Sequence, residues 1–268
     1  MNKAIADFIK QWVAITKKLY IVSFKDTFIK NTIMKNVLFL SITFILCNYQ
    51  VKSIEPKLDK FIKTIAWSGQ ASVAFPLNDK QIYLDPYQLK STGKADLIFI
   101  THSHGDHLSI DDVKKIATAS TKIYAPESCH ADLQSAGFNP VKVLPGETLS
   151  IDGIKINVVP AYTMTKSTHP KSNNWVGYVL KADGIKIYHP GDTEHIPEMK
   201  NIDCNITFMP LGQKYTMNSV DDAVQSAIDV KAEVAIPFHY GMYEGKDEDA
   251  VEFKEKLKNK IEVVLLER

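Results

Sequence analysis

The chain has 268 residues, of which 45% are hydrophobic and 24% are charged, so it can form one large globular domain with or without a terminal appendage. A formal net charge of +1 excludes the class of strongly basic nucleic-acid binders. The three cysteines, Cys47, Cys129 and Cys204, are too few and too scattered for a disulfide framework or a thiolate zinc site.

The first 33 residues carry a charge different from that of the rest of the chain. Six lysines stand there against two aspartates, a balance of +4, so the remainder carries −3 (+1 minus +4). This balance argues against phosphate-backbone contacts by the main domain. We interpret residues 1–33 as an extension whose biological relevance is doubtful, with Met34 as the biological start.

Residues 34–56 resemble an export signal. Lys35 precedes a short apolar run at 37–46, too short to cross a bilayer core of about 30 Å. Cys47 then stands where a bacterial lipoprotein has its acylated cysteine, although the small side chain usual before such a cysteine is missing. We expect a protein of the periplasm or cell envelope, either attached to the membrane through Cys47 or free. The alternative is a cytoplasmic protein with an N-terminal helix packed on the domain.

From residue 57 to the C-terminus, short apolar segments bounded by Gly, Pro, Asn and Asp alternate with helical patterns. Hairpins are expected among the early strands, with Asp-Gly turns at 152–153 and 183–184. The later strands alternate with helices, so the pattern predicts an α/β domain over 57–268, with sheets packed face to face and helices outside. Strands are predicted at 64–67, 72–75, 81–84, 97–101, 122–125, 155–159, 175–180, 185–188, 206–209, 234–238 and 261–266. Helices are predicted at 113–119, after a Ser-x-x-acid start at 109–112, and at 127–136, 220–230 and 247–259.

The clearest chemical signal is a cluster of metal-ligand residue types after the apolar strand at 97–101. In an extended backbone, residues two apart point the same way, so His102 and His104 can share one ion. A glycine then lets the chain turn and direct Asp106 and His107 toward a second ion. Imidazole and carboxylate suit zinc, manganese or iron, and the lack of thiolates argues against a purely structural zinc. The sequence predicts one or two divalent ions, Zn²⁺ first, with Mn²⁺ or Fe²⁺ as alternatives.

The pattern His-x-His-x-Asp-His at 102–107 resembles the signature of the metallo-β-lactamase-fold superfamily, and the resemblance spans about 63–268. It implies a four-layer αβ/βα sandwich in which the metals bind at one edge of two central sheets. The segments at 209–212 and 215–217 resemble the small branch similar to ascorbate-6-phosphate lactonase.

The resemblance implies roles for residues beyond the signature. Asp192, in Gly-Asp-Thr, matches the carboxylate that bridges both metals, and His239 matches the last metal-binding histidine. Asp85 matches an acid that supports the ligands from behind. Gln70 replaces a histidine that relatives often have after the same glycine, and it can donate a hydrogen bond but not titrate. His189 either supports the site or is a satisfied histidine at a strand end.

One expected ligand is missing. Relatives carry a third histidine in a Pro-Ala-aromatic-His setting, whereas residues 160–163 end in Thr163. The nearest substitute is His169, in the loop that follows, and we predict that it binds metal. The alternative is that His169 faces solvent, with Thr163 near a weak or absent metal on that side.

These residues predict a dizinc hydrolase acting on an ester, lactone or phosphoester of a small molecule. Asp106 is the carboxylate best placed to orient water, whose pKa two ions would lower to about 7, and to pass a proton to the leaving group. Lys166 and Lys171 flank His169, and a lysine precedes Tyr215, so these residues either contact an anionic substrate or belong to solvated surface. The alternative from another class is a metal-binding envelope protein without turnover. No nucleic-acid partner is expected, and the sequence indicates no oligomeric state.

Overall fold

The computed structural model describes residues 10–11, 14, 54–90 and 93–268. The chain divides into two units, Met1–Ser53 and Ile54–Arg268. Residues 34–53 of the predicted signal segment, with Cys47, lie outside the described residues, as does most of the extension before them. Among the helices formed by the described part of the chain, none combines the length and apolar character that crossing a bilayer requires.

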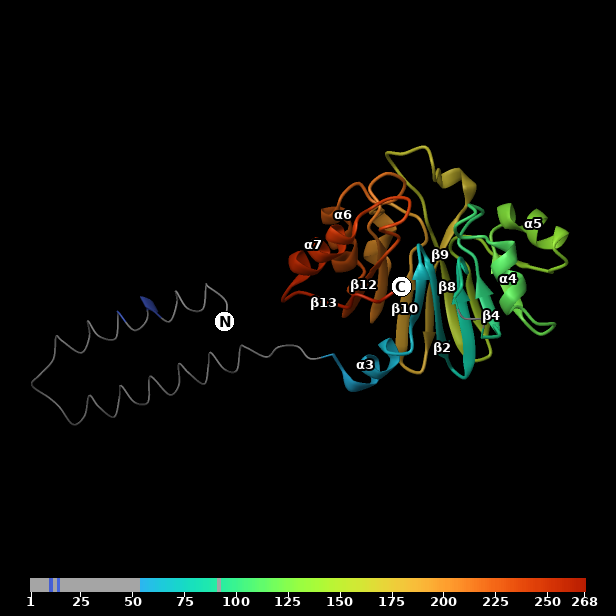
Figure 1. The fold of residues 1–268 in the computed structure, drawn as a ribbon, viewed down its shortest axis with the longest axis horizontal. Helices are drawn as coiled ribbons and strands as arrows, with labels where there is room; N and C mark the ends of the chain where they lie inside the picture. Colours follow the sequence, from blue (N-terminus) through green and yellow to red (C-terminus); the bar gives the residue numbers. More distant parts are fainter. Residues whose placement is uncertain (1–9, 12–13, 15–53, 91–92) are drawn as a thin grey trace, which may run out of the picture. The chain divides into compact units, whose positions relative to one another are not determined.

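Two mixed sheets form the centre of the Ile54–Arg268 unit (Figure 1). The first is six-stranded in the order β1-β2-β3-β4-β5-β6, antiparallel up to β3 and parallel from there. Its strands are β1 Ala66–Gly69, β2 Ser72–Leu77, β3 Lys80–Leu84, β4 Leu97–Phe99, β5 Lys122–Ala125 and β6 Val141–Lys142. The second is seven-stranded in the order β13-β12-β11-β10-β9-β8-β7, antiparallel from β7 to β10 and parallel from there. Its strands are β7 Thr148–Ile151, β8 Ile154–Pro160, β9 Val176–Ala182, β10 Ile185–His189, β11 Ile206–Pro210, β12 Val234–Phe238 and β13 Glu262–Val263.

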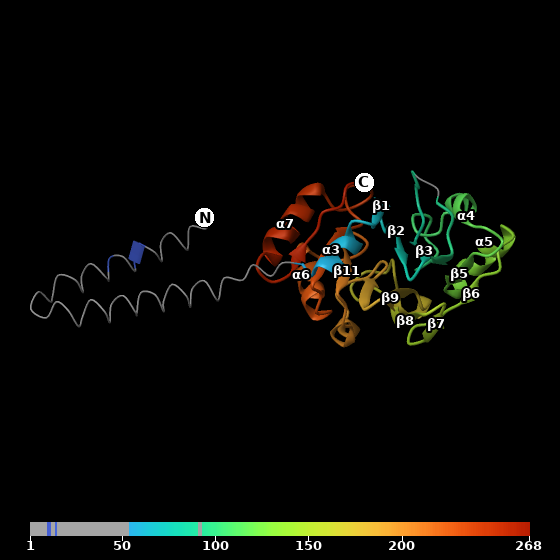
Figure 2. The ribbon, with the colours of Figure 1, turned by 90° about the horizontal axis from the view of Figure 1, so that it is seen from below.

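Helices cover both outer faces of the sheets. Figures 1 and 2 show α4 and α5 on one side of the strands and α6 and α7 on the other. The predicted α/β fold, two sheets between helical layers, is confirmed. The α-helices of the described unit are α3 Pro56–Ile62, α4 Ile110–Ile116, α5 His130–Ser135, α6 Val220–Asp229 and α7 Asp247–Leu257. Short 3₁₀ helices lie at Glu127–Cys129, Lys171–Asn173 and Pro197–Asn201.

Strand β4 is apolar throughout because both of its faces are buried. Leu97 and Phe99 point into the core between the sheets, where the Phe99 ring lies 5.1 Å from that of Tyr178 in β9. Ile98 and Ile100 point the other way, into the core beneath α4 and α5. Successive side chains of a strand alternate between faces, so a central strand buried on both sides reads as a continuous apolar run.

Parallel pairing brings the loops that follow several strands to the same end of each sheet. β3 and β4 are parallel in the first sheet, and β10, β11 and β12 are parallel in the second, so their carboxyl ends lie together within each sheet. Loops that leave these ends carry most of the polar residues singled out in the sequence, which is the usual place for a site in such sheets.

Candidate metal centre

Seven histidine and aspartate side chains meet in two groups at the carboxyl ends of these strands. Within each group, one donor atom per residue lies within 4.8 Å of all the others. The structure therefore brings together all seven residues that the sequence predicted as ligands. The first group is His102, His104, His169 and Asp192, and the second is Asp106, His107 and His239.

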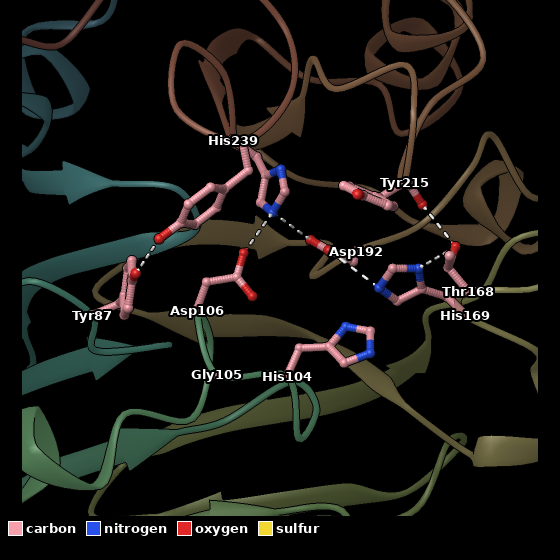
Figure 3. A pocket seen from close by; sticks show the side chains of 10 residues that line it. Tyr87, His104, Gly105, Asp106, Thr168, His169, Asp192, Tyr215 and His239 are labelled. Carbon is pink, nitrogen blue, oxygen red and sulfur yellow. Dashed lines mark hydrogen bonds and ion pairs between the residues drawn. The ribbon is translucent and has the colours of Figure 1, made fainter.

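Asp192 belongs to the first group but also faces the second with its other carboxylate oxygen (Figure 3). Its Oδ2 is 3.2 Å from His169 Nε2 and 3.9 Å from His102 Nε2. Its Oδ1 is 3.2 Å from both His107 Nε2 and His239 Nε2. Around a tetrahedral ion with bonds of ~2.0–2.1 Å, neighbouring donors are about 3.3 Å apart, so these spacings suit an ion on each side of the carboxylate.

Several buried polar atoms at this meeting point have no hydrogen-bond partner within the part of the chain that the structure describes. They include Nε2 of His107, Nε2 of His169 and Oδ1 of Asp192. Each such atom costs about 1–3 kcal/mol when it is left unpaired, and one ion at each group would satisfy all three. The donors are imidazole nitrogens and carboxylate oxygens, which suit zinc, iron or manganese. The residues present thus fit one divalent ion per group.

Asp85 holds the signature segment from behind. It is buried at the end of β3, with a φ of +46°. Its carboxylate accepts hydrogen bonds from the peptide nitrogen of Thr101, at 2.7 Å, and from the Thr101 hydroxyl, at 2.6 Å. It also lies 2.8 Å from His107 Nδ1, which turns His107 Nε2 toward the second group. A partner of this kind fixes both the orientation and the tautomer of a ligand histidine.

The electrostatics of the cluster keep Asp192 ionised. Burial raises the pKa of Asp192, but His107 and His239 outweigh burial and bring that pKa well below its ordinary value. Burial and then His107 lower the pKa of His102 well below its ordinary value, which keeps this imidazole neutral. A neutral imidazole and a charged carboxylate are the forms that bind metal.

The Gly-Asp-Thr sequence is needed for close packing as well as for its carboxylate. Gly191 has a φ of +64°, and a Cβ there would lie 2.9 Å from Cβ of Thr101. Only glycine at this position therefore lets the backbone before Asp192 approach Thr101, the residue next to the 102–107 signature.

Gln70 and His239 join β1 and β12 beside the second group. Both residues have left-handed backbones, with φ of +45° and +55°, and the peptide nitrogen of His239 donates to the Gln70 carbonyl at 3.0 Å. The Gln70 amide nitrogen lies 3.0 Å from Asp106 Oδ2 and 3.3 Å from His239 Nε2. Non-glycine residues in this region cost about 1–3 kcal/mol each, and such strain is common at functional sites.

His169 reaches the first group because the loop after β8 closes on itself. The peptide nitrogen of Thr163 donates to the His169 carbonyl at 2.8 Å, and the Thr163 hydroxyl donates to the Lys166 carbonyl at 2.7 Å. Thr163 is thus buried at the base of the loop rather than among the donors. Thr163, where the resemblance implied a histidine, thus closes the loop that brings His169 to the first group.

The two lysines have partners away from the donors. Lys166 Nζ donates to the Thr216 carbonyl at 2.7 Å and lies 3.3 Å from Glu194 Oε1. Lys171 pairs with Glu198 at 2.8 Å. Neither lysine is among the residues that line the cavity described below, so both of their interpretations, contact with an anionic substrate and solvated surface, stay predictions.

His189 matches the second of its two interpretations, a satisfied histidine at a strand end. It is buried, its Nε2 lies 2.8 Å from the Ala71 carbonyl, and its Nδ1 accepts from the Gly191 nitrogen at 3.3 Å. These contacts join β10 to the turn after β1. It belongs to neither donor group.

A cavity of about 790 Å³ opens over both groups (Figure 3). Tyr215 lies at the His169 side, and the hydroxyls of Tyr87 and Tyr243 meet at 2.5 Å on the Asp106 side. Among the described residues, no lysine or arginine lines it. Sequence reasoning missed Tyr87, Thr168 and Tyr243, because only the folded loops bring them to the donors. The lining residues are Tyr87, His104, Gly105, Asp106, Thr168, His169, Asp192, Tyr215, His239 and Tyr243.

Comparison with known proteins shows which family the chain belongs to. A family model described as a β-lactamase superfamily domain matches residues 64–239. A UPF0173 metal-dependent hydrolase of Methanopyrus kandleri is 30% identical over 226 residues, which are 76% of this chain and 96% of the relative. A crystal structure from Parabacteroides distasonis, provisionally named a metal-dependent hydrolase, has 34% identity and a TM-score of 0.67 over 75% of this chain and 91% of its own.

A more distant likeness concerns a diiron β-hydroxylase from Streptomyces venezuelae. It has 14% identity and a TM-score of 0.62, over 75% of this chain and 52% of its own, and it shows the fold alone. The family model covers well over half of the chain, and the Methanopyrus relative is matched almost from end to end. This chain therefore belongs to the β-lactamase superfamily, has the metallo-β-lactamase fold, and is homologous to the UPF0173 metal-dependent hydrolases.

Proposed function

We propose that the protein is a hydrolase that uses two divalent ions, zinc first, to cleave an ester, lactone or phosphoester bond of a small molecule. The observation that carries the proposal is Asp192, whose two oxygens face two donor groups at the floor of one open cavity. A purely structural metal site is closed by its protein ligands, whereas a catalytic site keeps an open position. The names of the homologous metal-dependent hydrolases support the same reaction class.

Asp106 is the residue to which we assign proton transfer. Ions at these groups would polarise the scissile carbonyl or phosphoryl oxygen and lower the pKa of water to about 7. The Asp106 carboxylate lines the cavity with 22% of its side chain exposed, and the Gln70 amide holds its Oδ2 at 3.0 Å. It can therefore accept a proton from the attacking water and deliver it to the leaving oxygen.

The walls of the cavity favour a substrate that is uncharged away from the reacting bond. The phenols of Tyr87, Tyr215 and Tyr243 and the hydroxyl of Thr168 line it, and no cationic side chain of the described residues does. An anionic group would thus be recognised at the metal floor rather than at the walls. Phenols offer a hydrogen-bond donor and an aromatic face, which suits neutral rings and acyl groups.

The test is turnover on a panel of lactones, phosphodiesters and β-lactams by zinc- and manganese-loaded protein. We expect chelator-sensitive cleavage of one ester class, and loss of both metal and activity in Asp106→Ala/His107→Ala. His130→Ala, on α5 beside the Ala125 carbonyl, is the matched histidine control and should keep both. Metal-loaded protein that turns over none of the panel would favour a binding protein without turnover.

We also propose that the chain acts in the periplasm or cell envelope, on the basis of the signal-like residues 34–46 and Cys47. Metabolic labelling with an alkyne fatty acid in a bacterial host distinguishes the anchored form from the free one. Labelling that disappears in Cys47→Ser supports attachment. Unlabelled protein in the cytosol contradicts export.

A further inference from the structure

Glu244, in the loop between β12 and α7, lies behind His239 and outside both donor groups. Its side chain is 1% exposed, and its Oε1 lies 3.0 Å from His239 Nδ1. Its Oε2 accepts hydrogen bonds from the peptide nitrogens of Lys214, at 3.0 Å, and Tyr215, at 2.6 Å. One buried carboxylate thus contacts a histidine of the second group and the loop that carries a cavity wall.

The surrounding backbone is shaped to admit this carboxylate. A Cβ on Gly212 would lie 1.8 Å from Cδ of Glu244, so any side chain at 212 would displace the glutamate. The Glu244 carbonyl in turn accepts from the peptide nitrogen of Gly241 at 3.1 Å, which closes the loop that begins at His239. The glutamate is therefore held in one position relative to the His239 ring.

The histidine ring needs such a partner on one particular nitrogen. A neutral imidazole has one N–H, so Nε2 is free to bind an ion only if Nδ1 carries the hydrogen. Nδ1 of His239 is buried, and it has no aligned hydrogen-bond partner among the described residues. An oxygen of the Glu244 carboxylate lies 3.0 Å from it. On the far side of the ring, Nε2 faces Asp192 Oδ1 at 3.2 Å.

We propose that Glu244 is a positioning residue that fixes the Nδ1–H tautomer of His239 and so keeps Nε2 free as a donor atom of the second group. The inference rests on the proposed role of His239 as a metal ligand. The tautomer itself is a property of the ion-free protein, so it can be measured apart from metal binding and turnover.

Glu244→Gln keeps the shape of the side chain but replaces one acceptor oxygen of the carboxylate with an NH₂ group, which donates. The peptide nitrogens of Lys214 and Tyr215 hold the single amide oxygen in the place of Oε2, which turns the amide NH₂ toward His239 Nδ1. A donor at that position requires an unprotonated Nδ1, so the hydrogen moves to Nε2. In that tautomer Nε2 has no lone pair for an ion.

The experiment is long-range ¹H–¹⁵N NMR of ¹⁵N-histidine-labelled full-length protein without metal, at a pH high enough for the His239 ring to be neutral, since a protonated ring carries a hydrogen on both nitrogens. The chain has eight histidines, and the His239 signals are those lost in His239→Gln. We expect Nδ1–H in the wild type and Nε2–H in Glu244→Gln. An Nε2–H tautomer in the wild type overturns the proposal even if the variant fails to fold. An unchanged tautomer in the folded variant overturns it as well.

Glu194→Gln is the matched control. Its side chain is also 1% exposed, but its carboxylate binds the peptide nitrogens of Met164, at 2.9 Å, and Thr165, at 3.1 Å, and no histidine ring. Glu194→Gln removes an equally buried negative charge that does not contact His239, so this variant should keep the Nδ1–H tautomer of His239. A shift to Nε2–H in this control would mean that buried charge, not contact, sets the tautomer, and would overturn the proposal.

Zinc titration provides the second readout. Wild-type protein should bind two ions, and Glu244→Gln should weaken the ion at the second group by at least the 10–100-fold typical of a lost ligand partner, while the first ion is kept. Equal weakening of both ions would overturn the specific role of Glu244. Wild-type protein with the Nδ1–H tautomer but no bound ion would contradict the proposed function and leave the tautomer assignment supported.

Discussion

His169 is the residue at which this chain departs most from the family pattern that it resembles. Its Nε2 lies 3.2 Å from Asp192 Oδ2. It reaches this position because the peptide nitrogen of Thr163 donates to the His169 carbonyl and so closes the loop from Thr163 to His169. We predict that His169→Ala weakens the affinity for one ion by more than about 10–100-fold, measured by competition with a chromophoric chelator. His195→Ala, which removes a histidine paired with Asp229, should change neither affinity. Unchanged affinity in His169→Ala would contradict its assignment as a metal ligand.

The donors could be predicted from the sequence to different degrees. His102 and His104 lie two residues apart shortly after β4, so their spacing in the sequence could predict that they share an ion. His169 could be proposed only as the nearest substitute, because the path of its loop depends on Thr163 and on contacts with Glu194. Glu244 left no local signal, since the peptide nitrogens of Lys214 and Tyr215 that hold its carboxylate lie about thirty positions earlier in the chain.

At the level of elements, Asp112 joins helix α4 to the segment that follows β3. Its carboxylate accepts from the peptide nitrogens of Gln88, at 2.8 Å, and Leu89, at 3.3 Å. Burial raises the pKa of Asp112, but hydrogen bonds from Lys115 and Ser109 outweigh it, and the pKa falls below its ordinary value. The segment it holds carries a phenol of the cavity wall.

The contribution of Asp112 to stability should therefore depend on pH in a stated direction. Because its folded pKa is lowered, the stabilisation is present in full above the unfolded-state pKa and is lost as pH falls through the folded value. We expect Asp112→Asn to lower the free energy of unfolding by about 1–3 kcal/mol at pH 7, with the difference shrinking below about pH 4. The exposed neighbour Asp111 gives the control: Asp111→Asn should stay within about 0.5 kcal/mol. A difference that grows toward low pH would contradict this assignment.

Elements with strong periodicity could be predicted, and short ones could not. β5 and β12 have the predicted bounds, since their apolar residues end at clear breaks. β6 consists of two exposed residues, Val141–Lys142, and no burial pattern marks it. Helix α3 was missed because its pattern rests on two buried positions, Leu58 and Ile62. Tertiary contacts rather than local preference define such elements.

At the level of the whole molecule, the unit that holds the metal centre begins at Ile54. Leu58 and Ile62 of α3 are 3% and 5% exposed and belong to the main core. We predict that a chain beginning at Ile54 has the same unfolding midpoint in urea as the full chain. A chain beginning at Ile65 should lose about 3–6 kcal/mol, the burial of two aliphatic side chains. A large loss already in the Ile54 chain would place residues 1–53 in the fold.

The central proposal is that the two donor groups on either side of the Asp192 carboxylate would each hold one ion. It is tested most directly by anomalous diffraction at the zinc absorption edge on crystals of the zinc-loaded protein. The account predicts two peaks, one on each side of the Asp192 carboxylate, the first contacted by His102, His104 and His169 and the second by Asp106, His107 and His239. A single peak, or peaks away from Asp192, would contradict it.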